Sequence, residues 1–160
     1  MLDRRLLIAA VAAGCVSCSA SDDEEAELRL LVDSAEIAAE ERQTGYFRSL
    51  LAESYTDNRG NNHERMIDIF RGYFLMHPSL EIVTRVNTIE LLGEDAAEIS
   101  LLAGIVGQRT GGLLLGGVDG RLYDLDIELI RNGSDWQVIG ATWDRALEDW
   151  EGGEIPEIER

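Results

Sequence analysis

The segment 123-YDLDIELIRNGSDWQVI-139 decides the fold class, because apolar and acidic side chains alternate along it before an Asn-Gly pair. Alternation with a period of two predicts a strand with one buried face. The Asn-Gly pair predicts a tight hairpin into a second strand. On this register, Leu125 and Ile127 should be buried, whereas Asp124 and Asp126 should be exposed to solvent.

The same period appears upstream of this hairpin, after a helical first half of the chain. Residues 80–86 and 99–105 alternate as further strands. Three helices are predicted by apolar spacing: one over 28–40, a short one after Gly45, and one from a cap at Asn61 or Asn62 to the residue before Pro78. Helices followed by strands predict an α+β domain with the N-terminal helices packed on a curved antiparallel sheet.

The N-terminus has the pattern of an export signal. Arg4 and Arg5 precede an apolar run at 6–13, which is too short to cross a membrane as a helix. The small residues before Cys15 resemble a lipobox, in which signal peptidase II cleaves and the cysteine receives a lipid. Cys18 is a second possible site, and ordinary secretory cleavage near residues 19–20 is the other alternative.

This reading divides the chain into four parts. They are a lipoprotein signal peptide (1–14), an acidic tether (15–27), a folded domain (28–149) and a flexible acidic tail (150–160). We expect a palmitate-type lipid anchor that holds the protein in the bacterial cell envelope. Since Val16 follows the cysteine, the resemblance to enterobacterial sorting implies the outer membrane, with the domain facing the periplasm.

Composition limits the partners. The chain has a net charge of −17, and its 14 basic residues are all arginines, which are scattered singly after the signal. Nucleic-acid binding needs clustered cations, so we exclude it. The lack of lysine also removes the P-loop ammonium and Schiff-base chemistry.

The order of elements resembles a known superfamily. A long helix, a short second helix ending in Tyr55-Thr56-Asp57, a third helix and a meander closing at 136–143 are similar to the nuclear transport factor 2-like (SnoaL-like) cone-shaped fold. The resemblance covers about residues 26–145 and implies a cavity between helices and sheet. The superfamily includes isomerases, dehydratases, adaptors and dimerisation modules, so the fold alone does not select a function.

The resemblance makes Asp57 the nearest match to a catalytic base, with Tyr55 or Tyr123 as a hydrogen-bond donor. Asp57 also begins an Asp-Asn-Arg-Gly stretch, in which an aspartate ordinarily bonds its own turn, and we favour that role. The candidates for a binding pocket are the following residues: Phe47, Tyr55, Asp57, Phe70, Tyr73 and Phe74.

No motif indicates a cofactor or a metal. His63 and His77 lie in no zinc-ligand spacing, and we expect them at the surface or at helix ends. The acidic side chains at 124–128 are expected on a solvated sheet face. The glycine-rich stretch 107–120 matches no phosphate-binding loop and is either a passive connection or a mobile apolar flap.

Three functions remain open on this basis. The first is a non-catalytic binding or interaction module, with a small apolar molecule as its ligand. The second is an isomerase- or dehydratase-type enzyme that uses Asp57, and the third is a structural homodimer formed through the sheet. A buried carboxylate of raised pKa, an enclosed apolar cavity or an exposed apolar sheet face would distinguish them.

Overall fold

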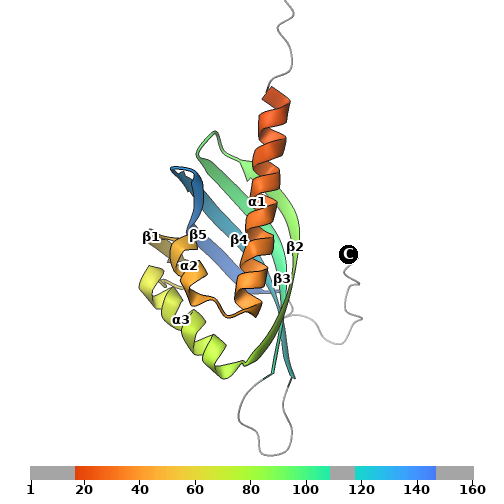
Figure 1. Cartoon of the computed structure of the whole chain (residues 1–160), viewed down its shortest axis with the longest axis vertical. Helices are drawn as coiled ribbons and strands as arrows, with labels where there is room; N and C mark the ends of the chain where they lie inside the picture. Colours follow the sequence, from red (N-terminus) through yellow and green to blue (C-terminus); the bar gives the residue numbers. More distant parts are fainter. Residues whose placement is uncertain (1–16, 109–117, 147–160) are drawn as a thin grey trace, which may run out of the picture.

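The computed structural model describes residues 17–108 and 118–146, which form a layer of helices against one sheet (Figure 1). The elements in chain order are α1 (Ser17–Glu40), α2 (Thr44–Leu50), β1 (Leu51–Asp57), α3 (His63–Met76), β2 (Ser79–Leu91), β3 (Ala96–Gln108), β4 (Val118–Asn132) and β5 (Asp135–Arg145). All three helices lie on the same face of the curved sheet. The predicted α+β class is confirmed.

The sheet has the strand order β1-β5-β4-β3-β2 and is mixed. Strands β2 to β5 pair antiparallel, as the alternation predicts, but β1 pairs parallel with β5. The prediction that Tyr55-Thr56-Asp57 ends the second helix is therefore wrong. Strand β1 carries a register shift between Leu51 and Thr56, so its buried positions do not alternate regularly. The sequence of β1 therefore lacks the period of two that predicts a strand.

The hairpin formed by β4 and β5 has the register that the sequence predicts. Asn132 pairs with Asp135 across a two-residue loop, in which Gly133 takes a φ of 68°. Asp124 and Asp126 are exposed, as expected. Leu125 and Ile127 face the helices but are only partly buried, because both line a cavity described below.

Helix α1 begins earlier than expected. Residues 17–27, predicted as a solvated tether, are helical, and Arg131 of β4 pairs with Glu24 at 3.8 Å and Glu27 at 3.1 Å. The acidic residues predicted a tether because they repel one another. Arg131, which offsets this repulsion, lies 104 residues from Glu27, so the local sequence does not indicate the pairing. Leu28, fully buried, begins the packed part of the helix.

Side chains of α1 bind the edge strand β2. Oε2 of Glu36 accepts hydrogen bonds from the backbone N–H of Thr84 at 3.0 Å and from its hydroxyl at 2.8 Å. Oε1 of Glu40 accepts one from the backbone N–H of Ile82 at 2.9 Å. These bonds fix the height of α1 over the sheet.

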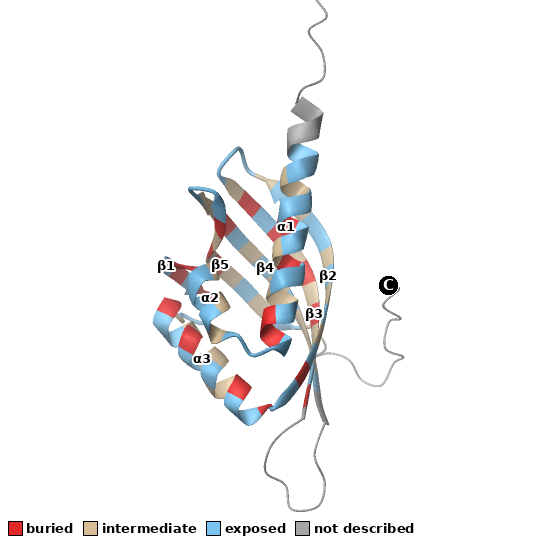
Figure 2. Cartoon of the chain, in the orientation of Figure 1, coloured by how far each residue is buried: buried red, intermediate tan, exposed pale blue. Residues whose placement is uncertain are grey.

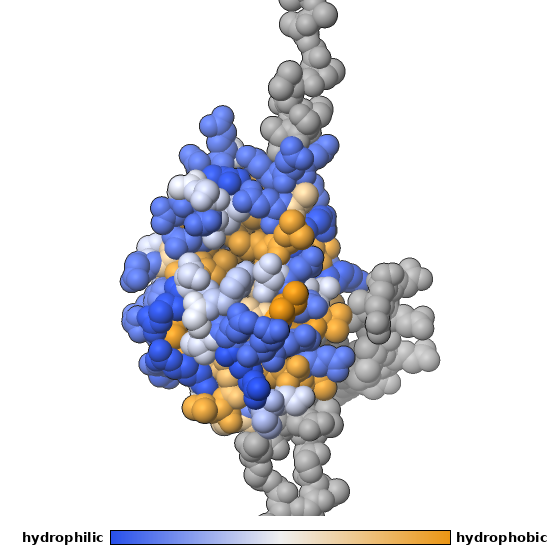
Figure 3. Space-filling view, viewed as in Figure 1, coloured by the Kyte–Doolittle hydropathy of each residue, from blue (hydrophilic) through white to orange (hydrophobic). Residues whose placement is uncertain are grey.

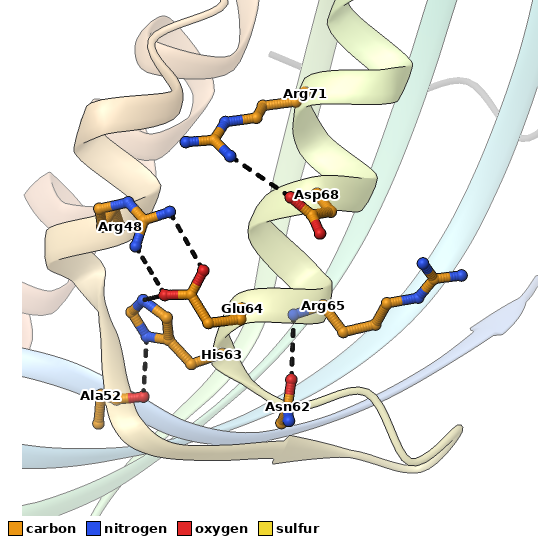
Figure 4. Close-up of polar contacts among 8 residues, drawn as sticks. All are labelled: Arg48, Ala52, Asn62, His63, Glu64, Arg65, Asp68 and Arg71. Atoms are coloured by element: carbon orange, nitrogen blue, oxygen red, sulfur yellow. Dashed lines mark hydrogen bonds and ion pairs between the residues drawn. The ribbon is translucent and has the colours of Figure 1, made fainter.

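Helix α3 begins at the cap that the sequence predicts. The side chain of Asn62 accepts a hydrogen bond from the backbone N–H of Arg65 at 3.0 Å. Arg48 of α2 donates to Glu64 of α3 at 2.8 Å, which ties the two helices together at the surface (Figure 4).

The core follows the inner face of the sheet and the facing stripes of the helices (Figure 2). Its most deeply buried large side chains are Leu28, Ile67, Ile99 and Leu129, each at most 1% exposed. The helices do not pack against the whole inner face of the sheet. The space left between the helices and the sheet forms a cavity.

Candidate functional site

A cavity of about 610 Å³ lies between the helices and the inner face of the sheet. This volume falls within the roughly 300–1,000 Å³ of small-molecule sites. In the space-filling view, apolar surface lies along α1 between hydrophilic regions (Figure 3). The cavity walls come from all three helices and from the inner face of the sheet, so the whole fold positions it.

The predicted aromatic residues line this cavity. Phe47 of α2 stacks on Phe70 of α3 at 4.4 Å between ring centroids, and Phe74 follows at 6.0 Å from Phe70. Tyr55 and Tyr73 complete the aromatic set. Of the six pocket candidates, only Asp57 is missing from the lining.

The opposite wall is aliphatic and comes from the sheet. Inward-facing residues of β3 and β4 supply it, including Ile99, Leu101, Leu125, Ile127 and Leu129. The alternation places these residues on the inner face of the sheet, and it predicted that Leu125 and Ile127 are buried. The alternation of apolar residues predicts which face of the sheet a side chain is on, but it does not predict whether a helix covers that face.

Asp57 ends β1 and turns into the following loop. Its Oδ1 accepts hydrogen bonds from the backbone N–H groups of Arg59 at 2.9 Å and Asn61 at 2.8 Å. Its Oδ2 accepts from Nδ2 of Asn61 at 2.7 Å and from Nε1 of Trp143 at 3.2 Å. Asp57 therefore has the turn-forming role and also fixes the indole of Trp143, which lines the cavity.

The electrostatics of Asp57 oppose a role as a general base. Burial by itself would raise the pKa of Asp57, but the hydrogen bonds from Asn61, Trp143 and Arg59 outweigh it and hold the pKa below its ordinary value. A base that works near neutral pH needs the opposite shift. Burial raises the pKa of Tyr55, and the negative charge of Asp57 adds to that effect, so Tyr55 stays a neutral phenol.

Both histidines lie at the ends of α3, one of the two placements expected for them, but neither lies at the surface. His63 is 4% exposed and His77 is 1% exposed. Nδ1 of His63 lies 3.2 Å from the carbonyl oxygen of Ala52 (Figure 4), and Nδ1 of His77 lies 2.9 Å from that of Tyr73. His77 also stacks on Tyr73 at 4.1 Å. The sequence showed that they lie at the ends of α3, but not that other elements cover those ends.

Neither histidine lines the cavity. In the part of the chain that the structure describes, Nε2 of each ring is buried and has no hydrogen-bond partner. The described cavity lining therefore contains no histidine and no Asp–His pair. Its single carboxylate is that of Glu36, which Thr84 already occupies with two hydrogen bonds.

Sequence analysis missed three arginines that line the cavity: Arg59, Arg121 and Arg145. The guanidinium of Arg59 lies 3.7 Å from the ring centroid of Trp143. Tyr123 also lines the cavity, with its ring 5.8 Å from that of Trp143. The alternation contained the signal for two of these arginines, because Arg121 lies two residues before Tyr123 and Arg145 two after Trp143, on the inward face.

Two further findings bear on the site. Within residues 17–108 and 118–146, no three His, Cys, Asp or Glu side chains form a group that could hold a metal ion. None of the described helices is long and apolar enough to span a membrane. Cys15 lies outside the described residues, as does most of the glycine-rich stretch, from 109 to 117.

Comparisons with known proteins identify the fold and nothing finer. No family model matches the chain, and no curated protein matches it. Several solved structures resemble it closely in shape but are at most 15% identical in sequence.

Three of these structures are representative. The hexachlorocyclohexane dehydrochlorinase LinA-type3 of Novosphingobium barchaimii LL02 has a TM-score of 0.67 at 13% identity, over 81% of this chain and 91% of its own. A nuclear transport factor 2-like superfamily protein of Salmonella enterica serovar Typhimurium LT2 has a TM-score of 0.66 at 10% identity, over 84% and 99%. Bd1075 of Bdellovibrio bacteriovorus has a TM-score of 0.67 at 14% identity, over 81% of this chain, which spans only 44% of that protein.

These likenesses agree with the arrangement derived above, in which three helices cover a curved mixed sheet and leave an apolar cavity between the two layers. The chain has the nuclear transport factor 2-like cone-shaped α+β fold.

Proposed function

We propose that this protein is a lipoprotein of the bacterial envelope, anchored through Cys15, whose domain binds a small and largely apolar molecule without converting it. The observation that carries the proposal is the composition of the cavity. Its walls are mostly aromatic and aliphatic, whereas Asp57, the candidate base, lies outside the lining. Burial of apolar ligand surface, at roughly 25 cal/mol per Å², supplies affinity in such a pocket without any reacting group.

The enzymatic alternative is supported by the fold alone. The dehydrochlorinase that the chain resembles shows that this fold can hold a catalytic site. Tyr55 and Tyr123 line the cavity and could donate hydrogen bonds, but Asp57 has a lowered pKa and four hydrogen bonds of its own. We therefore favour binding.

Charge opposes the dimer through the sheet. Glu98 lies directly opposite both Glu90 and Glu128, so three glutamates form one row across β2, β3 and β4. Asp124 and Asp144 are opposite each other on the same outer face. A second copy docked there would bring like charges together, which destabilises a pair.

The test is native mass spectrometry of the protein purified from its own membranes. We expect a bound small molecule whose mass stays unchanged during incubation. Ala103→Trp should remove it by filling the cavity, because Ala103 lies on β3 and lines the cavity. Val83→Trp is the matched control, since Val83 is exposed on β2 and does not line the cavity. Circular dichroism checks that both variants are folded.

Two results would contradict the proposal. Loss of the bound molecule in both tryptophan variants would place it elsewhere. A mass change that proceeds with the wild type and stops with Asp57→Asn would establish catalysis. An NMR titration of Asp57 gives independent support if its pKa lies below the ordinary aspartate value of about 3.9.

A further inference from the structure

Tyr55 carries a buried hydroxyl group that the fold leaves without a hydrogen bond. Its side chain is 3% exposed and lines the apolar cavity. Within residues 17–108 and 118–146, its phenol oxygen has no hydrogen-bond partner, and the interaction that acts on it is the charge of Asp57. Buried polar groups in folded proteins nearly always have a partner, so this exception calls for an explanation.

The phenol oxygen of Tyr55 is open to the cavity. Other buried polar atoms of the described side chains also lack a partner, but they are sealed from solvent: Nε2 of His63, Nε2 of His77 and Nε1 of Trp136. The Tyr55 oxygen is not among these sealed atoms, so it keeps contact with open space. Because Tyr55 is buried and lines the cavity, that space is the cavity itself. The O–H group is therefore available to a bound molecule.

The other hydroxyl groups of the described lining are placed differently. The hydroxyl of Thr84 donates to Glu36 at 2.8 Å, and Tyr73 and Tyr123 are only partly buried. Water inside the cavity can bond the Tyr55 hydroxyl, but a ligand that expels this water has to replace the bond. A ligand without an acceptor atom leaves the hydroxyl unpaired and binds less well for that reason.

We propose that the ligand is an uncharged, largely apolar molecule with one carbonyl-type oxygen, which accepts a hydrogen bond from the phenol of Tyr55. The rest of the molecule lies against the aromatic and aliphatic walls. A carboxylate is disfavoured at this place, because the negative charge of Asp57 acts on Tyr55. Burial raises the pKa of Tyr55, so its phenol keeps the proton that it donates. The inference rests on the proposed binding function and adds the chemistry of the ligand to it.

The test compares 2-acetylnaphthalene with 2-isopropylnaphthalene, which is nearly the same size but lacks the carbonyl oxygen. Equilibrium dialysis at pH 7.5 gives each dissociation constant, and the full chain is used with Cys15→Ser, so that no attached lipid competes. Tyr55→Phe removes the hydroxyl and keeps the ring. We expect this variant to bind 2-acetylnaphthalene about tenfold more weakly than the wild type, as for the loss of one hydrogen bond. Its affinity for 2-isopropylnaphthalene should not fall.

Two further measurements separate recognition from a structural role. Tyr46→Phe is the matched control, because the Tyr46 hydroxyl donates to the carbonyl oxygen of Leu31 at 3.4 Å and does not line the cavity. This variant should leave both affinities unchanged. Tyr55→Phe should also leave the melting temperature of the unliganded protein undiminished, since its hydroxyl forms no hydrogen bond within the fold. The anion 2-naphthoate should bind the wild type more weakly than 2-acetylnaphthalene.

The outcomes distinguish the two proposals. If Tyr55→Phe weakens both naphthalenes equally, or weakens neither, the carbonyl inference is wrong and the apolar-binding function stands. A lowered melting temperature would assign the hydroxyl a structural partner, and tighter binding of 2-naphthoate would make the ligand an anion; either result overturns the inference. If none of the three probes binds the wild type, the proposed function itself fails, and this inference fails with it.

Discussion

Asp57→Asn should destabilise the fold far more than the same exchange at an exposed aspartate such as Asp126. Oδ1 of Asp57 accepts two backbone N–H bonds, which an asparagine oxygen can retain. Oδ2 accepts from Nδ2 of Asn61 and from Nε1 of Trp143, and an asparagine amide would point two N–H groups at these donors. With Asp57 8% exposed, losing two charged hydrogen bonds should cost about 2–4 kcal/mol of unfolding free energy.

The effect depends on pH in a defined direction. Since hydrogen bonds lower the folded-state pKa of Asp57, its stabilising contribution is present above the unfolded pKa of about 3.9 and is lost as pH falls through the folded pKa. Urea unfolding at pH 7 and at pH 3, followed by tryptophan fluorescence, measures this contribution. Asp126→Asn, at an exposed position on β4, is the control and should change the free energy by a few tenths of a kcal/mol. Equal losses in the two variants, or an undiminished difference at pH 3, would refute the reasoning.

Three further predictions concern the sheet, a close glycine contact and the anchor. Leu129→Ala should cost about 2–5 kcal/mol in urea unfolding, because Leu129 is 1% exposed. Leu125→Ala should cost less, because Leu125 is only partly buried, and equal losses would contradict this difference in burial. Gly107→Ala should lower the unfolding free energy by about 1–3 kcal/mol, because the added Cβ would lie 2.8 Å from the buried ring of His77. Gly120→Ala is the control, since a Cβ there meets open space. Similar melting temperatures for the two variants would contradict the contact. Cys15→Ala should abolish the lipid mass seen by mass spectrometry and the detergent partitioning of the chain, and a retained lipid would move the anchor to another residue.

The parts of the fold that the sequence predicts are those with local signals. The alternation over 123–129 and the Asn-Gly turn set the β4–β5 register, and Asn62 caps α3 as expected. Strand β1 was missed because its partner, β5, lies more than 80 residues away and its register shift breaks the period of two. A parallel pair joined over that distance leaves no turn signal.

The site was predicted in its aromatic half only. Apolar spacing placed Phe47 on the inner face of one predicted helix and Phe70 and Phe74 on that of another, and the resemblance to the cone-shaped fold implied a cavity beside them. The cationic half comes from three segments that only the folded sheet brings together, and single arginines are ordinary on surfaces. Burial of His63 and His77 also depends on tertiary packing and not on their places in α3.

The hydrogen bonds from α1 to β2 also affect how readily a foreign strand can pair with the edge of the sheet. An exposed sheet edge is a template on which a foreign strand can polymerise. Here Glu36 and Glu40 occupy the N–H groups of Thr84 and Ile82, so an incoming backbone would find these donors taken and two carboxylates in its path. At the other edge, Nδ1 of His63 meets the carbonyl oxygen of Ala52 on β1. The contacts that join α1 to β2 thus also occupy two backbone donors of this edge strand, and His63 occupies one backbone acceptor of β1.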